Sequence, residues 1–214
     1  MARCIHSAHM QKKAVPNEYV KLTKLQEIAF ALQTECVCPL KETATQPVVG
    51  EGNPDADVFF IGEAPGKNED LEGRPFIGAA GKILDRLLQD IALDRTAVYI
   101  TSIEKFRPPN NREPKPGEIM ACFPYLEAQI TIIEPKLIVT LGRHALRRML
   151  EWEQGVPLRS PLSIDELHGK PITGKSGRTY FPMYHPAAAL YNRKLMDVLK
   201  NDIKKIPSLL KKKS

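Results

Sequence analysis

Short runs of consecutive apolar residues recur along this chain, and turn-forming residues bound each of them. The four clearest runs are Val58–Gly62, Ala97–Thr101, Leu137–Leu141 and Tyr180–Tyr184. A continuous apolar run of four to eight residues is typical of a strand that is buried on both faces, as in a parallel sheet. We therefore predict a central, mainly parallel sheet of four strands.

Segments with helical periodicity separate these runs, because their apolar residues recur at spacings of three and four. The predicted helices cover residues 18–33, 78–91, 116–133, 143–152 and 193–206. Strands that alternate with amphipathic helices favour right-handed crossover connections. The predicted fold class is therefore α/β, a three-layer α/β/α sandwich. Residues 153–178 carry several Gly and Pro residues and form a long excursion with room for a short edge strand.

The domain organisation follows from the same pattern. Residues 1–17 show no periodicity and are expected to form a flexible N-terminal arm, and residues 208–214 are expected to form a basic C-terminal tail. A chain of 214 residues can bury one sizeable core. We therefore assign residues 18–207 to a single domain, and we expect a monomer because no segment indicates an interface.

Composition narrows the classes of protein to consider. Apolar residues make up 43% and charged residues 26%, and no apolar run approaches the ~20 residues that span a bilayer. The first residues lack the pattern of an export signal, so we expect a cytoplasmic protein whose four cysteines are thiols or metal ligands. A net charge of +6 and a pI of 9.1 favour a polyanionic partner, although part of the excess lies in the tail.

The segments that follow the four predicted strands carry most of the candidate chemistry. They read GEAPGKNED, SIEKFRPPNNR, GRHAL and HPAAALYN in chain order. In open parallel sheets, ligands bind beyond the carboxyl ends of the strands. We therefore expect these segments to meet and form a site.

The first of these segments extends into a longer pattern, GEAPGxxEDxxGRPFxGxAGxxLDxLL, which resembles the first motif of the family 4 (iron–sulfur) uracil-DNA glycosylases. The segments RPPNNREPKPGEIMAC, LGRHAL and HPAAAL continue the resemblance in order, from about residue 32 to residue 202. The resemblance implies a DNA-repair enzyme that flips uracil out of DNA into a pocket. It then hydrolyses the N-glycosidic bond and leaves an abasic site.

The resemblance also implies roles for particular residues. His185 would donate a hydrogen bond to the oxygen of the departing uracil, and Glu63 would position or activate water. Glu69 would support the pocket or the water, and Phe76 would stack on the flipped base. No lysine stands in place of the water-activating group, so we expect a monofunctional glycosylase without a Schiff-base lyase step.

Further residues would bind the substrate. Ala64, Pro65 and Gly66 would shape the pocket wall, and the DNA-binding set consists of Arg107, Asn110, Asn111, Arg112, Tyr191 and Arg193. The first four of that set have side chains suited to phosphate and sugar contacts. Tyr191 and Arg193 lie near the tip of the segment that would wedge into the vacated base stack.

One departure from the family concerns the base. The family has an asparagine at the end of the second strand whose amide pairs with the uracil edge, and Ser102 stands there. A hydroxyl cannot reproduce the two-sided reading of an amide. Because sites built on hydrogen-bond readout discriminate strongly, the change could weaken or broaden base specificity.

The second departure concerns the [4Fe-4S] cofactor of the family, which four cysteine thiolates hold. The aligned positions carry Glu35, Cys38, Phe106 and Cys122, and Cys36 lies one residue late. At most three thiolates remain, whereas such clusters normally take four. We therefore expect the cluster to be lost and Phe106 to fill part of its space. Cys4, His6 and His9 could in principle supply another ligand.

The leading interpretation is uracil excision from single- or double-stranded DNA. Three alternatives follow, beginning with the one whose chemistry is most similar. The same reaction on another deaminated or mismatched base is the nearest, because of Ser102. A non-catalytic homologue that binds damaged or single-stranded DNA is the next, although retention of Glu63, Phe76 and His185 argues against it. A nucleotide binder ranks last, because the turn at 62–66 lacks both the Walker and the dinucleotide glycine spacing.

Overall fold

The computed structural model describes residues 16–158, 160 and 162–211. The predicted arm at 1–17 therefore lies outside the described residues except for its last two, and Asn17 already belongs to the first helix. Among the described helices, none combines the length and the apolar character needed to cross a bilayer.

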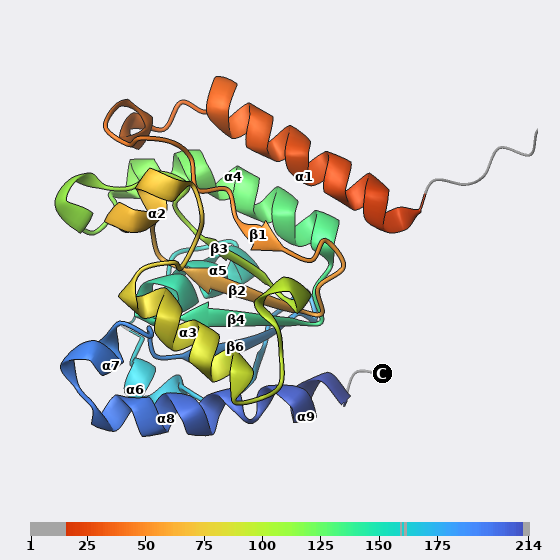
Figure 1. Ribbon diagram of the computed structural model, residues 1–214, viewed down its shortest axis with the longest axis vertical. Helices are drawn as coiled ribbons and strands as arrows, with labels where there is room; N and C mark the ends of the chain where they lie inside the picture. The colour runs from red at the N-terminus through yellow and green to blue at the C-terminus, as the bar shows by residue number, and fades with distance from the viewer. Residues whose placement is uncertain (1–15, 159, 161, 212–214) are drawn as a thin grey trace, which may run out of the picture.

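A six-stranded sheet forms the centre of the molecule, in the order β1-β3-β2-β4-β6-β5 (Figure 1). Its four inner strands are parallel: β2 (Val58–Gly62), β3 (Tyr99–Ser102), β4 (Leu137–Leu141) and β6 (Thr179–Met183). The short edge strands β1 (Glu51–Gly52) and β5 (Ile172–Thr173) pair antiparallel with β3 and β6. The predicted parallel strands are confirmed, and the sheet is wider by one short strand at each edge.

Nine α-helices lie around the sheet in the described part of the chain. They are α1 (Asn17–Thr34), α2 (Lys67–Glu72), α3 (Ala79–Gln89), α4 (Pro116–Ile133), α5 (Arg143–Gln154), α6 (Ile164–Leu167), α7 (Ala188–Tyr191), α8 (Lys194–Ile203) and α9 (Ile206–Lys211). Single 3-10 turns occupy Pro39–Glu42, Arg95–Ala97 and Pro109–Asn111. The short helices α2, α6 and α7 lack enough turns to show periodicity, which is why the sequence did not predict them.

Two hydrophobic cores, one on each face of the sheet, confirm the three-layer architecture. Alternate residues of β2 point to opposite faces. Phe59 and Ile61 belong to the core with α1, α4 and α5, whereas Val58 and Phe60 belong to the core with α3 and α8. Figure 1 shows α1 and α4 above the sheet and α3 and α8 below it.

The C-terminal segment differs from the prediction of one helix to residue 206 followed by a tail. Helix α8 ends at Ile203, and a second helix, α9, begins at Ile206 and carries Pro207 in its first turn, where proline is tolerated. Ile206 is fully buried, and Leu209 and Leu210 pack against the same core. This apolar contact holds the segment as far as Lys211 against the domain.

The strand order places the functional segments at one edge. Strand β2 pairs with β3 on one side and with β4 on the other, so the direction of strand addition reverses at β2. Such a reversal creates a crevice at the carboxyl ends of the strands. The register pairs Gly62 with Ser102, and this brings the loop after β2 beside the end of β3.

Candidate active site

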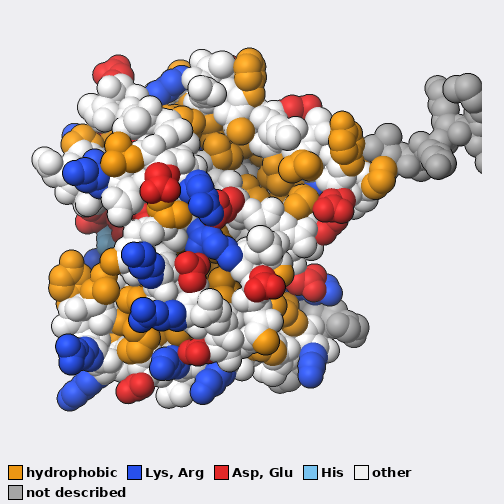
Figure 2. All heavy atoms as spheres, viewed as in Figure 1, with side chains coloured by type: hydrophobic (Ala, Val, Ile, Leu, Met, Phe, Trp, Pro, Cys, Tyr) orange, Lys and Arg blue, Asp and Glu red, His pale blue; other side chains and the backbone are white. Residues whose placement is uncertain are grey.

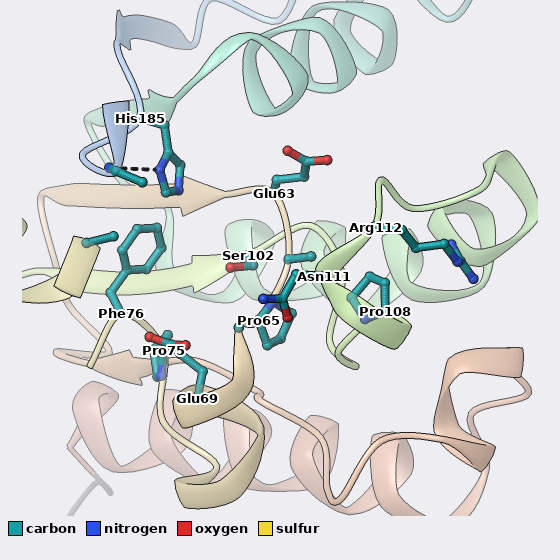
Figure 3. A pocket seen from close by; sticks show the side chains of 14 residues that line it. Glu63, Pro65, Glu69, Pro75, Phe76, Ser102, Pro108, Asn111, Arg112 and His185 are labelled. Atoms are coloured by element: carbon teal, nitrogen blue, oxygen red, sulfur yellow. Dashed lines mark hydrogen bonds between the residues drawn. The ribbon is translucent and has the colours of Figure 1, made fainter. Parts of the chain in front are cut away.

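A cavity of about 440 Å³ lies at the carboxyl ends of β2, β3 and β6 (Figure 3). The sequence-predicted residues that line it are Glu63, Ala64, Pro65, Gly66, Glu69, Phe76, Ser102, Asn111, Arg112 and His185. Pro75, Ala80, Pro108 and Ala187 complete the lining. The predicted catalytic and base-binding residues therefore share one cavity, whereas Arg107, Asn110, Tyr191 and Arg193 do not line it.

His185 follows β6 and presents one ring nitrogen to the cavity. The backbone N–H of Ala187 donates to Nδ1 at 3.2 Å, so Nδ1 acts as the acceptor and a neutral ring carries its proton on Nε2. Burial lowers the pKa of His185 to about 4, although the nearby Glu69 carboxylate opposes this shift. His185 is therefore neutral near pH 7 and can act as an Nε2–H donor.

Phe76 forms one wall of the cavity from an unusual backbone conformation. Its φ is +51°, in the left-handed region that few side chains adopt. Its ring centroid lies 5.7 Å from that of His185. A side chain at Gly62 would collide with the Phe76 ring, and one at Gly81 would collide with the Phe76 carbonyl. These two glycines therefore make room for the ring and for its strained backbone.

Arg95 holds the Phe76 turn from behind, and the sequence analysis did not single it out. Its guanidinium donates to the carbonyls of Pro75 and Phe76, the latter at 3.1 Å. It is anchored in turn by Glu51 at 2.7 Å and Asp85 at 2.9 Å. No sequence signal marks an arginine 19 residues away as a partner of this turn, because only the packing of the 3-10 turn at Arg95–Ala97 brings the two together.

The carboxylate of Glu69 accepts hydrogen bonds from backbone N–H groups of the pocket wall. Its Oε1 accepts hydrogen bonds from the N–H groups of Ile77 and Gly78, at 3.0 and 2.8 Å. Gly78 is the N-cap residue of α3, and a carboxylate at a helix N-terminus is stabilised by the helix dipole. Glu69 therefore fixes the turn that carries Phe76, and this geometry favours the supporting function over direct water activation.

Glu63 follows β2 directly and carries a carboxylate with a raised pKa. Burial is the main cause; the nearby His144 and Arg143 oppose the shift, and the carboxylate of Glu113 adds to it. Nδ1 of His144 lies 2.9 Å from Glu113 and 4.0 Å from Glu63. The GRHAL segment was predicted to reach the site from its place after a strand, but nothing in the sequence pairs His144 with Glu63.

Ser102 and Asn111 face the cavity from the β3 side (Figure 3). Ser102 is buried at the end of β3. Asn110 and Asn111 both have positive φ, 55° and 53°, a conformation that asparagine tolerates better than most residues. Nε of Arg107 donates to Oδ1 of Asn111 at 2.7 Å, and this fixes the amide at the rim.

The remaining predicted DNA-binding residues differ in how freely their side chains can contact DNA. Two nitrogens of Arg112 donate to the two carboxylate oxygens of Glu118, at 2.8 and 2.6 Å, and Figure 3 shows the guanidinium directed away from His185. The Arg112 guanidinium is thus paired with Glu118, although its side chain stays 35% exposed. Tyr191 is 90% exposed at the end of α7, and Arg193 is also exposed.

The cysteines that are described do not fit a cluster held by four thiolates. Cys36, Cys38 and Cys122 are buried free thiols. Phe106 is 1% exposed and belongs to the same core, so an aromatic ring fills the place of one aligned ligand. Glu35, at another aligned position, is exposed. Cys4, His6 and His9 lie outside the described residues.

Comparison with known proteins agrees with the geometry. A family model described as the uracil DNA glycosylase superfamily matches residues 49–206. A type-4 uracil-DNA glycosylase of Sulfurisphaera tokodaii is 49% identical over 176 residues, which cover 80% of this chain and 78% of the relative. The type-4 enzymes of Saccharolobus solfataricus and Thermotoga maritima are 45% and 42% identical, over 82% and 88% of this chain and 82% and 96% of the relatives.

Proposed function

Because this chain belongs to the uracil-DNA glycosylase superfamily and, within it, to the type-4 enzymes, we propose that it excises uracil from DNA by hydrolysing the N-glycosidic bond. The observation that carries the proposal is the shared cavity, in which a neutral His185, Phe76 and Glu63 surround one space. The enzyme would act as a monofunctional hydrolase and leave an abasic site. We also propose that the protein is a monomer and acts on DNA in the cytoplasm.

The chemistry divides between the two sides of the scissile bond. When the N1–C1′ bond breaks, its electron pair leaves with uracil and positive charge develops on the sugar, much as in glycoside hydrolysis. His185 Nε2–H would donate to the uracil oxygen on which negative charge develops. Water would then add to C1′, and Glu63 would orient it and accept its proton.

Phe76 would stack on the flipped uracil, a contact worth about 1–3 kcal/mol per base. Its ring centroid lies 5.7 Å from that of His185, so a base stacked on Phe76 would lie close to the donor. Glu69 and Arg95 would keep the Phe76 turn in place. Because catalysis depends on the alignment of reacting groups, such positioning contributes to the rate.

DNA would approach the carboxyl edge of the sheet, with Asn111 at the rim and Tyr191 on the exposed α7. Figure 2 shows basic side chains gathered over α8 and the adjoining α3 on the visible face. The exposed basic residues of these helices are Lys82, Arg86, Lys194 and Lys200. Positive charge beside the site favours the phosphate backbone, mainly through counterion release.

The test is incubation of the purified protein with a labelled single-stranded oligonucleotide that carries one uracil, followed by alkaline cleavage. We expect a cut at the uracil and none with a thymine control. His185→Ala is expected to reduce the rate by roughly 10²–10³-fold, as for the loss of an oxyanion donor. Equal cutting by wild type and His185→Ala would contradict the assigned role.

A second candidate substrate follows from Ser102, which stands where the family has an asparagine. Its hydroxyl does not reject other bases as an amide would. If the uracil oligonucleotide stays intact, a panel containing hypoxanthine and mismatched pyrimidines separates this candidate from a protein that only binds damaged DNA. A cut in the panel supports an enzyme with another base specificity, whereas binding without cutting supports the non-catalytic alternative.

A further inference from the structure

A buried group of two thiols and one carboxylate lies outside the cavity, under the loop after β3. The sulfur atoms of Cys38 and Cys122 and a carboxylate oxygen of Glu104 lie within 4.8 Å of one another. All three side chains are buried, Glu104 completely. They come from three separate segments, since Cys38 precedes the 3-10 turn at Pro39–Glu42, Glu104 follows β3, and Cys122 lies on α4.

Glu104 has no partner that explains its burial. Neither carboxylate oxygen finds a hydrogen bond of good geometry, and the Cys122 thiol is a polar neighbour that interacts with the carboxylate. The adjacent Lys105 offsets the burial of Glu104 only in part, through its charge, because Lys105 Nζ donates its hydrogen bonds to other groups, among them Thr101 and Gln129 at 2.6 and 2.7 Å. A buried carboxylate without a hydrogen-bond partner is costly, and a bound cation would stabilise its charged form.

We propose that Cys38, Cys122 and Glu104 bind a single thiophilic divalent cation, best matched by zinc, in place of a cluster held by four thiolates. Zinc accepts thiolate and carboxylate ligands at about 2.3 and 2.0–2.2 Å, which spaces tetrahedral ligand atoms roughly 3.5–4 Å apart. The three ligand atoms already lie within 4.8 Å of one another, so small side-chain movements would bring them to this spacing. An iron–sulfur cluster does not fit, because Phe106 fills part of its space and no fourth thiol is described. Water would occupy the fourth position.

The cation would add a direct link among three segments that hydrogen bonds already connect in part, from Cys38 Sγ to the Glu118 carbonyl at 3.8 Å and from Lys105 Nζ to Gln129 at 2.7 Å. On binding, the two thiols lose their protons to solvent and the carboxylate supplies the third negative ligand. The backbone N–H of Glu104 donates to the carbonyl of Glu63 at 3.0 Å. The site therefore connects directly to the loop that carries Glu63, and metal binding would stiffen that loop.

Cys36 provides a matched control. It is a third buried thiol, two residues from Cys38, but its sulfur lies outside the group and contacts the Ala121 carbonyl at 4.0 Å. Cys36→Ser therefore changes a buried thiol of the same segment without removing a proposed ligand. Glu104→Gln keeps the shape of the side chain and removes only its charge, so it tests the site with the least risk to folding.

The experiment measures metal and acid-labile sulfide in the purified full-length protein, whatever its glycosylase activity. The metal-free protein is then titrated with Zn²⁺ and with Co²⁺, whose thiolate complexes absorb visible light. We expect one zinc per chain and no sulfide. The site should be lost in Cys38→Ser, weakened at least about tenfold in Glu104→Gln and retained in Cys36→Ser, with far-UV circular dichroism confirming that each variant is folded.

Three results would overturn the proposal. Iron and sulfide in equal amounts would show that a cluster assembles despite Phe106. Failure of the folded wild type to bind Zn²⁺ or Co²⁺ would show that Glu104 is buried without a metal. Loss of binding in Cys36→Ser as large as in Cys38→Ser would show that the ligand set is wrong. None of these results depends on whether the protein excises uracil.

Discussion

At the scale of single residues, the ionisation of Glu63 connects the site to pH. A water-activating carboxylate must be ionised, and burial raises the pKa of Glu63. Its charge is therefore lost at a higher pH than for an ordinary glutamate, so kcat/KM should fall as the pH is lowered through that pKa. His185 does not contribute to this fall above its own pKa of about 4, because it is already neutral there.

The acid limb of the pH profile is the range in which kcat/KM falls as the pH is lowered. Substitutions of two neighbours of Glu63 should shift this limb in opposite directions. Glu113 raises the pKa of Glu63 and His144 lowers it. Glu113→Gln should therefore shift the limb to lower pH, whereas His144→Gln should shift it to higher pH. The pH profile of kcat/KM on a uracil oligonucleotide measures both shifts. A shift of both variants in the same direction would contradict the assignment of the limb to Glu63.

Ser102 is the residue at which we expect a substitution to change base specificity. It is buried at the end of β3 and lines the cavity. Ser102→Asn restores an amide that can read both sides of the uracil edge, and it should raise the preference for uracil over hypoxanthine about tenfold. Ser102→Ala serves as the control and should not raise it. If Ser102→Asn leaves the excision rate and the base preference unchanged, the serine at this position does not alter base specificity, contrary to our prediction.

At the scale of elements, the turn between α2 and α3 depends on an arginine from another element. Arg95 binds the carbonyls of Pro75 and Phe76 and also Glu51. Arg95→Lys, which keeps the charge but cannot reach several partners at once, should lower kcat/KM about tenfold through misplacement of Phe76. Arg74 also pairs with Glu51 at 2.8 Å but touches neither carbonyl, so Arg74→Lys is the matched control.

The kinetic constants separate positioning from a general loss of stability. If Arg95 positions Phe76, Arg95→Lys should raise KM and lower kcat at a temperature where the variant remains folded. Thermal unfolding of both arginine variants provides the reference. Equal activity losses in Arg95→Lys and Arg74→Lys would mean that only the shared ion pair with Glu51 matters.

At the scale of the whole molecule, the exposed tip of α7 should matter for duplex DNA. Tyr191 is 90% exposed on α7, whereas Tyr19 is 63% exposed on α1, and Figure 1 shows these two helices on opposite sides of the sheet. A side chain inserted into the vacated stack helps to extrude a base from a duplex but is not needed in a single strand. Tyr191→Ala should therefore slow excision from duplex roughly tenfold more than from single-stranded DNA.

Tyr19→Ala should leave both substrates unaffected. Activities on matched single- and double-stranded uracil oligonucleotides, measured at one salt concentration, give the comparison. An equal loss on both substrates in Tyr191→Ala would point to general DNA binding by Tyr191 rather than to base extrusion.

The sequence by itself determined the layered architecture, because buried parallel strands and amphipathic helices leave local patterns. Strands β2 and β4 begin and end where their apolar runs do. It also predicted most of the cavity lining, since strand ends meet at one edge of a parallel sheet and the motifs that follow the strands resemble those of a known family. The short helices α2, α6 and α7 and the edge strand β1 were not predictable, because they are too short to show periodicity.

Only the tertiary structure decided which charged and polar groups lie beside the residues of the site. Arg95 behind Phe76, His144 beside Glu63 and the Glu104 group with its two thiols all join residues from separate elements. Desolvation is also a property of the packed molecule: it raises the pKa of Glu63 and keeps His185 neutral. Local sequence encodes which side chains stand at the strand ends, and packing decides their neighbours and their charge.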